Sequence, residues 1–110
     1  MKVYFTEHFR KQLKRLSKKF PKVKDDLLET VENLEIEKEV KIKKSIYKVR
    51  IKSSDMNKGK SGGFRSYIYL QRDADGLIPL CIYFKSETES ISDGDLQNHI
   101  EMTSREIALA

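Results

Sequence analysis

The sequence predicts an α+β domain with the element order β-α-α-β-β-β-α, in which helices pack on one face of a mainly antiparallel sheet to give two layers. Two helices are predicted first, because apolar residues recur three or four positions apart between residues 9 and 34. Three runs of alternating apolar and polar residues then predict strands at residues 46–53, 64–72 and 77–85. A last helix follows Ser92. Since the chain has 110 residues, we expect a single domain spanning residues 1–110.

The first two helices are predicted from their caps and their apolar stripes. A short strand at residues 2–5 precedes Thr6, whose hydroxyl can cap a helix, and Glu7 favours the positive end of that helix dipole. Pro21 suits the first turn of the second helix. Because the link is short, we expect an antiparallel helical hairpin. Its two apolar stripes are Phe9, Leu13, Leu16 and Phe20, then Val23, Leu27, Leu28, Val31 and Leu34.

The remaining elements are predicted from turn and cap residues. Residues 35–44 alternate acids and bases around a few apolar residues, so we expect an irregular crossing or a weak edge strand there. Asp73-Ala74-Asp75-Gly76 predicts a hairpin turn in which Gly76 adopts a positive φ. Pro79 should mark an edge or a bulge, because proline has no backbone N–H to donate. Ser92-Asp93-Gly94-Asp95 resembles a capping box that opens the last helix.

Composition excludes several classes of protein and site. No run approaches ~20 apolar residues, so a transmembrane span is excluded, and residues 1–5 lack the apolar core of a signal peptide. Cys81 is the single cysteine and cannot form an internal disulfide, which favours the cytoplasm as the compartment. Because no histidine is placed to activate Cys81, we expect it to be an apolar residue and not a nucleophile. No Cys, His and carboxylate cluster has metal-ligand spacing, so we expect no metal and no other cofactor. A net charge of +5 favours nucleic acid, an acidic protein or an anionic membrane surface as the partner.

The three main strands predict one cationic face that also carries tyrosines. Because the helices must cover the apolar face, we expect the other face to stay open. Phosphates bind cations and bases stack on tyrosine rings, so such a face suits a single-stranded polyanion. The residues expected on it are Lys48, Arg50, Lys52, Arg65, Tyr67, Tyr69, Cys81, Tyr83 and Lys85. The residues expected on the apolar side of the last strand are Ile78, Leu80, Ile82 and Phe84.

A glycine-rich cationic loop joins two of these strands and would rim the same face. It reads Asn57-Lys58-Gly59-Lys60-Ser61-Gly62-Gly63-Phe64-Arg65. Its glycines let the backbone approach phosphates closely and offer N–H donors, while Lys58 and Lys60 add positive charge.

Such a face is compatible with RNA cleavage as well as with RNA binding. Cleavage without a metal requires a base for the 2′-hydroxyl, cations for the phosphorane and an acid for the leaving 5′-oxygen. His8 and His99 lie on the terminal helices, away from this face. We therefore expect Arg65, Tyr83 and Lys85 to share the work, since a lysine among other cations has a lowered pKa. The alternatives are a face that binds RNA without cutting it and an ordinary solvated sheet face.

Three segments also resemble a known family in their order and spacing. They are Tyr47-Lys48-Val49-Arg50-Ile51-Lys52, the loop Asn57 to Arg65, and Ile82-Tyr83-Phe84-Lys85-Ser86. They resemble the RelE/HigB branch of bacterial toxin–antitoxin toxins, within the RelE/ParE superfamily. The resemblance implies a RelE-type fold, a toxin that enters the ribosomal A site and cuts messenger RNA, and a neutralising antitoxin encoded alongside. Related ParE toxins share the fold but inhibit DNA gyrase without nuclease chemistry, so a gyrase inhibitor is the second alternative.

The resemblance implies roles for individual residues. Arg65 matches the phosphate-stabilising arginine of the family, and Lys85 and Tyr83 match basic and aromatic positions of the late strand. Ser86 stands where RelE has an arginine, and no tyrosine follows Tyr83, so a HigB-like arrangement is the better match. The base is open between Lys85, Tyr83 and Glu87. Contacts to RNA or the ribosome are expected of Lys48, Arg50, Lys52, Lys58, Lys60 and Tyr67.

The first helix predicts a docking surface for the antitoxin. Its many cations favour an acidic, partly disordered segment that folds on binding, adding a helix or strand against the helical layer and the sheet edge. A merely solvated basic helix is the alternative. The charges expected to meet the antitoxin are Lys11, Lys14, Arg15 and Lys18.

Overall fold

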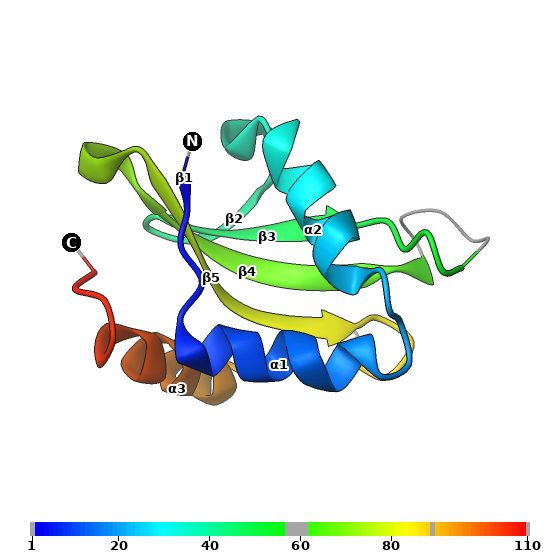
Figure 1. Cartoon of the computed structure of the whole chain (residues 1–110). Helices are drawn as coiled ribbons and strands as arrows, with labels where there is room; N and C mark the ends of the chain where they lie inside the picture. The colour runs from blue at the N-terminus through cyan, green and yellow to red at the C-terminus, as the bar shows by residue number, and fades with distance from the viewer. Residues whose placement is uncertain (1, 57–61, 89, 110) are drawn as a thin grey trace.

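A computed structural model describes residues 2–56, 62–88 and 90–109 of the chain (Figure 1). The elements in chain order are β1 (Lys2–Val3), α1 (Glu7–Ser17), α2 (Val23–Glu32), the 3-10 turn η1 (Ile36–Lys38), β2 (Val40–Lys43), β3 (Ile46–Ile51), β4 (Phe64–Gln71), the 3-10 turn η3 (Arg72–Ala74), β5 (Gly76–Phe84) and α3 (Asp93–Ser104). The α+β class and the order of elements are confirmed. Residues 35–44 contain the turn η1 and then β2, which is the weak edge strand that the sequence indicates.

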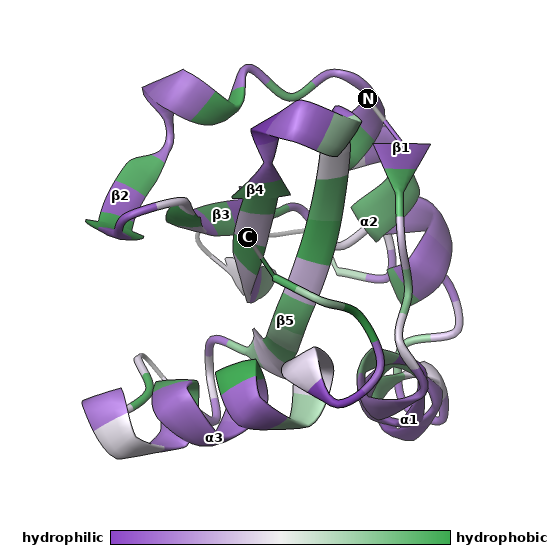
Figure 2. Cartoon of the chain, turned by 90° about the vertical axis from the view of Figure 1, so that its left-hand side faces the viewer, coloured by the Kyte–Doolittle hydropathy of each residue, from purple (hydrophilic) through white to green (hydrophobic). Residues whose placement is uncertain are grey.

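The strands form one sheet in the order β1-β5-β4-β3-β2. Every neighbouring pair is antiparallel except β1 and β5, which run parallel. The long strands β4 and β5 occupy the middle of this sheet and carry most of its hydrophobic residues, whereas α1 is mainly hydrophilic (Figure 2). Among the helices of the described ranges, none is long and apolar enough to cross a membrane.

Helices α1 and α2 begin at different kinds of cap. The Thr6 hydroxyl oxygen accepts a hydrogen bond from the Phe9 N–H at 3.1 Å, which confirms the predicted cap of α1. Pro21 lies in the turn before α2, which begins only at Val23. The two helices do not form the expected antiparallel hairpin, because α2 turns away from α1 at a steep angle (Figure 1). The reason is that α2 buries Val23, Leu27 and Val31 in the same core as the sheet, rather than against α1 alone.

The turn between β4 and β5 places its strained residue one position earlier than expected. Asp75 adopts the left-handed conformation with φ 49°, whereas Gly76 is already the first residue of β5. Aspartate tolerates this conformation better than most residues. A Cβ on Gly76 would lie 2.8 Å from the ring of Tyr4, so a larger residue there would have to displace that ring.

A bulge beside Pro79 divides β5 between the two faces of the sheet. Tyr67 pairs with Cys81 but the next residue, Ile68, pairs with Pro79, so Leu80 is the extra residue of β5. This confirms that Pro79 marks a bulge. The shift sends Ile82 and Phe84 into the core beneath α1 and α2, whereas Ile78 and Leu80 join a second core with Leu96 of α3. The expectation that all four lie on one face is therefore wrong.

Helix α3 covers part of the face that the sequence predicts to be open. The Ser92 hydroxyl oxygen accepts a hydrogen bond from the Asp95 N–H at 3.0 Å, which confirms the cap of α3. Leu96 then packs with Tyr67 and Tyr69, which are only 4% and 8% exposed. The cause is the bulge in β5, because it places Ile78 and Leu80 on this face, and α3 removes these apolar side chains from water.

Candidate functional site

The structure brings four of the five cations predicted on the strands together in one groove at the β2–β3 end of the sheet. The groove encloses about 480 Å³. Arg50 of β3 and Arg65 of β4 are directly opposite each other, and on the same strands Lys48 is opposite Tyr67. Like charges directly opposite on a sheet are unfavourable unless an anion lies between them, so this cationic groove favours an anionic ligand. Its lining residues are Lys38, Glu39, Val40, Ile42, Lys48, Arg50, Arg65 and Lys85.

Arg65 lines the cationic groove from a buried position. Its side chain is 4% exposed, and Nη1 donates a hydrogen bond to the carbonyl oxygen of Phe64 at 3.0 Å. The expectation of an open, solvent-facing Arg65 is therefore wrong. A guanidinium fixed in this way by the fold presents its charge to a ligand at little further entropic cost, which favours pre-organised binding of a phosphate.

Lys85 and Lys48 extend the cationic groove on either side of Arg65. The backbone N–H of Lys85 donates to the carbonyl oxygen of Gly63 at 3.1 Å, which fixes the end of β5 against the start of β4. A Cβ on Gly63 would collide with the carbonyl oxygen of Ile51, so only glycine fits there. Lys48 Nζ lies 5.9 Å from the centre of the Tyr67 ring, within the range of a cation–π interaction.

Tyr67 supports its neighbours but cannot stack on a base as expected. The ring is buried with α3, and its centre lies 6.2 Å from the centre of the Tyr83 ring. A base needs an exposed ring face, so the expected stacking by Tyr67 is wrong.

Tyr83 lies on the other side of Arg65 from the cationic groove. It is directly opposite Arg65 across β4 and β5 and is half-buried. Burial raises the pKa of Tyr83 well above its usual value, a hydrogen bond with Tyr67 raises it further, and the charge of Arg65 lowers it. The Tyr83 phenol is therefore neutral at physiological pH, which suits a proton donor rather than a base.

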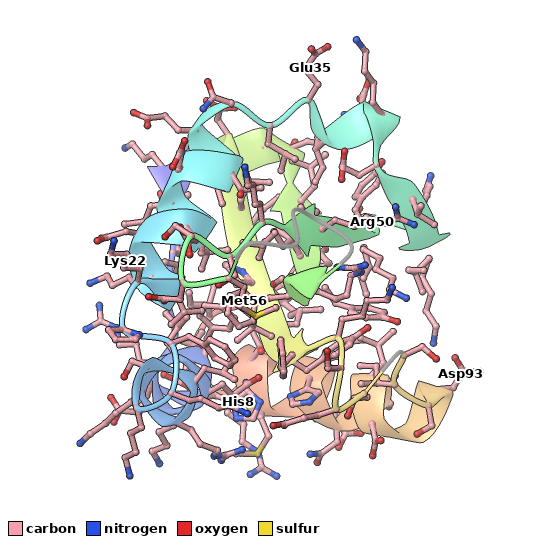
Figure 3. The ribbon with its side chains drawn as sticks, turned by 90° about the vertical axis from the view of Figure 1, so that its right-hand side faces the viewer. His8, Lys22, Glu35, Arg50, Met56 and Asp93 are labelled. Atoms are coloured by element: carbon pink, nitrogen blue, oxygen red, sulfur yellow. The ribbon has the colours of Figure 1, made fainter. Side chains whose placement is uncertain are left out.

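Tyr83 lines a second groove, between α1, β5 and α3, and this groove contains the two histidines. His8 Nε2 and His99 Nδ1 are 2.7 Å apart, a hydrogen bond in which one nitrogen donates and the other accepts. Burial is the largest cause that lowers the pKa of each histidine. The sequence places both on terminal helices but gives no sign that they meet, because the helices come together only when α1 and α3 flank β5 (Figure 3).

This histidine groove is separate from the cationic groove. It encloses about 340 Å³, and in Figure 3 His8 lies well apart from Arg50. Glu87, an open candidate for the base, lines the histidine groove with Arg15 rather than the cationic groove. Glu39 is the one carboxylate among the residues that line the cationic groove, and sequence reasoning missed it because residues 35–44 alternate acids and bases without a distinctive motif.

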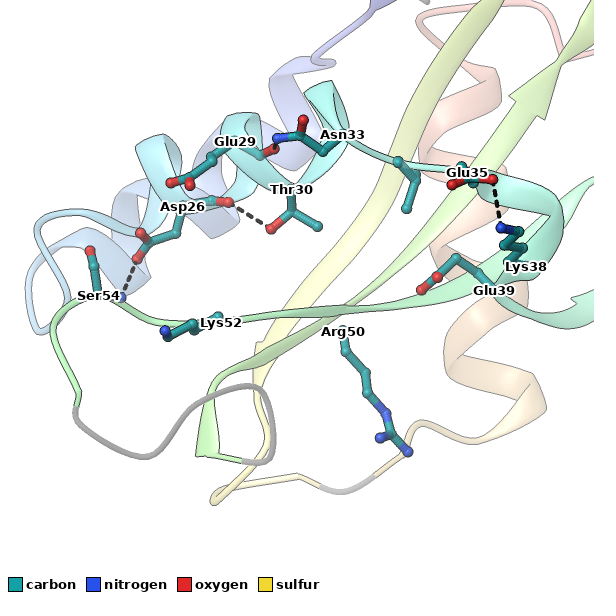
Figure 4. Close-up of a pocket in the computed structure, with 11 residues that line it drawn as sticks. Asp26, Glu29, Thr30, Asn33, Glu35, Lys38, Glu39, Arg50, Lys52 and Ser54 are labelled. Atoms are coloured by element: carbon teal, nitrogen blue, oxygen red, sulfur yellow. Dashed lines mark hydrogen bonds and ion pairs between the residues drawn. The ribbon is translucent and has the colours of Figure 1, made fainter.

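Lys52 lines a third groove, which lies between α2 and β3 (Figure 4). This groove encloses about 470 Å³ and also receives carboxylates from α2, such as Asp26 and Glu29. Asp26 is buried and accepts a hydrogen bond from the Ser54 N–H at 2.9 Å, which ties the end of β3 to α2. Arg50 lines both this groove and the cationic groove, so Lys52 is adjacent to the cationic groove and not part of it.

The remaining predicted site residues lie outside the cationic groove or outside the described residues. Lys58 and Lys60 belong to residues 57–61, which are not among the described residues. The cations of α1 that were expected to meet an antitoxin are exposed, and they are Lys11, Lys14, Arg15 and Lys18. Cys81 is buried, which raises its pKa to about 12 and leaves a neutral thiol, as expected of an apolar residue. Within the described ranges, no group of three or more His, Cys, Asp and Glu side chains is placed to hold a metal ion.

Comparison with known proteins identifies the family. The family model described as the RelE toxin of the RelE/RelB toxin–antitoxin system matches residues 1–110. A search of curated proteins finds no match to this chain. The family match covers the whole chain and agrees with the α+β fold, so the resemblance noted from the sequence is confirmed. This chain belongs to the RelE family and is the toxin of a toxin–antitoxin system.

Proposed function

We propose that the toxin is a ribosome-dependent endoribonuclease that cuts messenger RNA, uses no metal, and is neutralised by a cognate antitoxin. The observation that supports this most directly is the cationic groove, in which Arg50 and Arg65 are opposite each other with Lys48 and Lys85 nearby. The groove is lined by five cations, since Lys38 joins these four, and this positive charge matches the negative charge that builds on a phosphorane, whose stabilisation is the largest requirement of RNA cleavage.

In this proposal Arg65 stabilises the phosphorane, because its buried and hydrogen-bonded guanidinium is already fixed beside the groove. Arg50 and Lys48 hold the flanking phosphates, since they lie on β3 at the rim. Tyr83 lines the neighbouring histidine groove but is directly opposite Arg65, which lines the cationic groove, and from this position its neutral phenol donates the proton to the leaving 5′-oxygen. The 2′-hydroxyl proton goes to Lys85 or to Glu39, because both line the groove and can accept a proton when unprotonated.

The test has a cellular arm and a purified arm. Induction of the toxin without its partner should arrest translation, and primer extension on cellular messages should show cuts phased with codons. With purified ribosomes, the cuts should appear with added toxin and disappear when ribosomes are omitted. Intact messages during growth arrest would contradict the proposal.

Two other functions predict different results from the same experiment. A gyrase inhibitor would induce DNA damage while messages stay intact, and no observation on the cationic groove favours it. A module that only binds RNA would retain weaker binding in Arg65→Ala and would show neither toxicity nor cuts.

A further inference from the structure

The groove between α2 and β3 (the α2–β3 groove) adjoins the cationic groove. Three residues line both grooves, and they are Lys38, Glu39 and Arg50. Lys52 follows Arg50 just after the end of β3 and lines the α2–β3 groove beyond the cationic groove. In the described residues β2 pairs with β3 from Ile46 to Lys48, so α2 and η1 flank the rest of β3 instead of a strand. A strand of RNA in the cationic groove can therefore continue along β3 into the α2–β3 groove.

The α2–β3 groove has opposite charges on its two sides. Figure 4 shows Asp26 and Glu29 on α2, with Lys52 and Arg50 on the side of β3, where Arg50 points away from the helix. The groove encloses about 470 Å³, which is within the usual size range of sites for small molecules. A ligand made only of cations would meet Arg50 and Lys52, and one made only of phosphates would meet the carboxylates. A nucleotide avoids both conflicts, because its phosphate is anionic while its base is neutral and carries N–H donors.

The polar side chains of α2 in this groove are fixed and mainly offer acceptors. Asp26 is 6% exposed, and one of its carboxylate oxygens accepts from the Ser54 N–H at 2.9 Å. The Thr30 hydroxyl donates to the backbone carbonyl oxygen of Asp26 at 2.9 Å, and Asn33 Nδ2 donates to that of Glu29 at 3.0 Å. These bonds use donors within α2 itself. The groups that α2 presents to a ligand are therefore mostly carboxylate, amide and hydroxyl oxygens.

A side made of acceptors distinguishes the four bases. The Watson–Crick edge of guanine presents two donors side by side, N1–H and the N2 amino group, and the two oxygens of a carboxylate can accept from both. Adenine and cytosine present one amino group beside a ring nitrogen that accepts, and uracil presents one N–H between two carbonyl oxygens. A carboxylate repels these acceptor atoms. Guanine is therefore the base that matches the α2 side of the groove best.

We propose that the α2–β3 groove is a guanine-binding subsite for the RNA strand that occupies the cationic groove. Glu29 accepts from the guanine edge, because it is exposed, whereas Asp26 is buried and already accepts from the Ser54 N–H. Arg50 and Lys52 hold the adjoining phosphates. The proposal rests on the proposed function only in naming the strand as messenger RNA, since binding of guanine by the free toxin requires no cleavage.

The probe is a fluorescent hexauridine in which one uridine is replaced by guanosine, and every 2′-oxygen is methylated so that no cleavage can occur. The controls are the all-uridine strand and the same strand with inosine, which lacks the N2 amino group. Each strand is titrated into the full-length, isotope-labelled toxin. We expect the guanine strand to bind about tenfold more tightly than the all-uridine strand, with the inosine strand between them. The guanine strand should also shift the amides of residues 26–33 and 50–54 in NMR spectra.

Glu29→Gln and Glu32→Gln are matched variants on α2. Both remove one negative charge from an exposed residue of the same helix, but of the two only Glu29 lines the groove. Glu29→Gln should lower the preference for guanine to less than about threefold, because an amide accepts through one oxygen and carries no charge. It should bind the all-uridine strand at least as tightly as the wild type. Glu32→Gln should keep the tenfold preference.

Lys52→Gln tests the phosphate side of the same groove. It should weaken binding of all three strands by a similar factor and reduce the salt dependence of binding by roughly one phosphate contact. The preference for guanine should remain, because Lys52 lies on the side opposite the carboxylates of α2.

Four outcomes would overturn the subsite. These are equal binding of the guanine and all-uridine strands, an unchanged preference in Glu29→Gln, amide shifts confined to other surfaces such as α1, and preferential binding of an oligolysine peptide that Glu29→Gln abolishes. The subsite and the proposed nuclease can fail separately. A guanine preference that depends on Glu29 in a toxin that cuts no message would retain the subsite and remove the nuclease. Message cuts by a toxin whose RNA binding ignores guanine would retain the nuclease and remove the subsite.

Discussion

At the scale of single residues, Arg65 combines two duties that usually fall to different side chains. It is almost fully buried and hydrogen-bonded to the backbone, yet it lines the groove that carries Lys48, Arg50 and Lys85. A buried cation is costly unless the surrounding groups satisfy it. Burial also holds the guanidinium charge in one position, and a charge held in this way is what stabilisation of a transition state requires.

We expect Arg65→Ala to lower messenger RNA cleavage ~10²–10³-fold, the usual effect of removing a fixed transition-state donor. Because the residue is buried, the free energy of unfolding should also fall by about 1–3 kcal/mol. Single-turnover cleavage and urea unfolding measure the two effects. Arg50→Ala is the control, since Arg50 is exposed and should weaken RNA binding and its salt dependence without a loss of stability. Wild-type cleavage by Arg65→Ala would remove Arg65 from the site.

We expect Glu39→Gln to distinguish the two candidate bases of the proposed function. If Glu39 accepts the 2′-hydroxyl proton, the amide variant should lose ~10²–10⁴-fold in single-turnover rate while binding RNA at least as tightly. Lys85→Gln should then lose binding as well as rate, because it removes one of the groove's cations. A Glu39→Gln toxin with the wild-type rate would exclude Glu39 as the base.

At the scale of elements, the Gln12 side chain of helix α1 forms hydrogen bonds with the backbone of strand β5. Its Nε2 donates to the carbonyl oxygen of Leu80 at 3.3 Å, and its Oε1 accepts from the N–H of Ile82 at 3.0 Å. These backbone groups lie on the edge of β5 beyond the short pairing with β1. Gln12 therefore replaces a neighbouring strand at this part of the edge.

We expect Gln12→Leu to lower the free energy of unfolding by about 1–3 kcal/mol, because it leaves both backbone groups without their partner in a part-buried position. Gln12→Glu keeps the acceptor for the Ile82 N–H and loses the donor to the Leu80 oxygen, so it should cost less. Urea unfolding of the two variants provides the measurement. Equal stability of Gln12→Leu and the wild type would mean that water satisfies this edge.

The junction of α1 and α3 should loosen in acid. His8 faces Glu106 and Lys11, and His99 faces Asp95 and His8; burial lowers the pKa of both histidines below the usual 6.5. Because their pKa is lower in the folded state than in the unfolded state, the neutral histidines contribute to the free energy of unfolding. This contribution is fully present above about pH 6.5 and is lost as the pH falls through the folded-state pKa. Hydrogen bonds from the backbone N–H groups of His8 and Glu7 lower the pKa of Glu106, so its contribution is lost only further down, below about pH 4.5.

Hydrogen exchange measures this loosening. Between pH 7 and pH 5, corrected for intrinsic rates, the amides of α3 should lose protection earlier than those of β4, because α3 is the element that the histidine pair joins to α1. In His99→Gln the pair is gone, so the difference in protection between the two pH values should shrink. An unchanged pH dependence in His99→Gln would show that the pair does not control the junction.

At the scale of the whole molecule, the sequence predicts the element order and the cationic strands but not what covers them. Periodicity and caps are local, and they located α1, α3 and the three main strands. The bulge at Leu80 reverses the faces of half of β5, and no local signal reports its direction. Because of that reversal α3 packs on Tyr67, so the aromatic face that the sequence predicts to be open is partly buried. The histidine pair and Glu39 were missed for the same reason, because each depends on contacts between distant segments.

The cations of α1 are exposed, and α1 lies at the bottom of the view in Figure 1. A disordered acidic segment can cover such a surface, because it can wrap a large area as it folds. We expect Lys14→Glu/Lys18→Glu on α1 to slow association with the cognate antitoxin about tenfold at low salt, because it reverses the attraction that steers the encounter. Cleavage by the free toxin should not change, since neither residue lines the cationic groove.

Stopped-flow association with the co-purified antitoxin measures this effect, and growth rescue measures its consequence in the cell. The control is Lys22→Glu/Lys24→Glu, which carries the same net charge, so a specific effect must exceed the general loss of positive charge. Steering by charge weakens as salt rises, and the difference between variant and wild type should therefore narrow at high ionic strength. If the two double variants associate at the same rate, α1 is a solvated surface and the antitoxin docks elsewhere on the toxin.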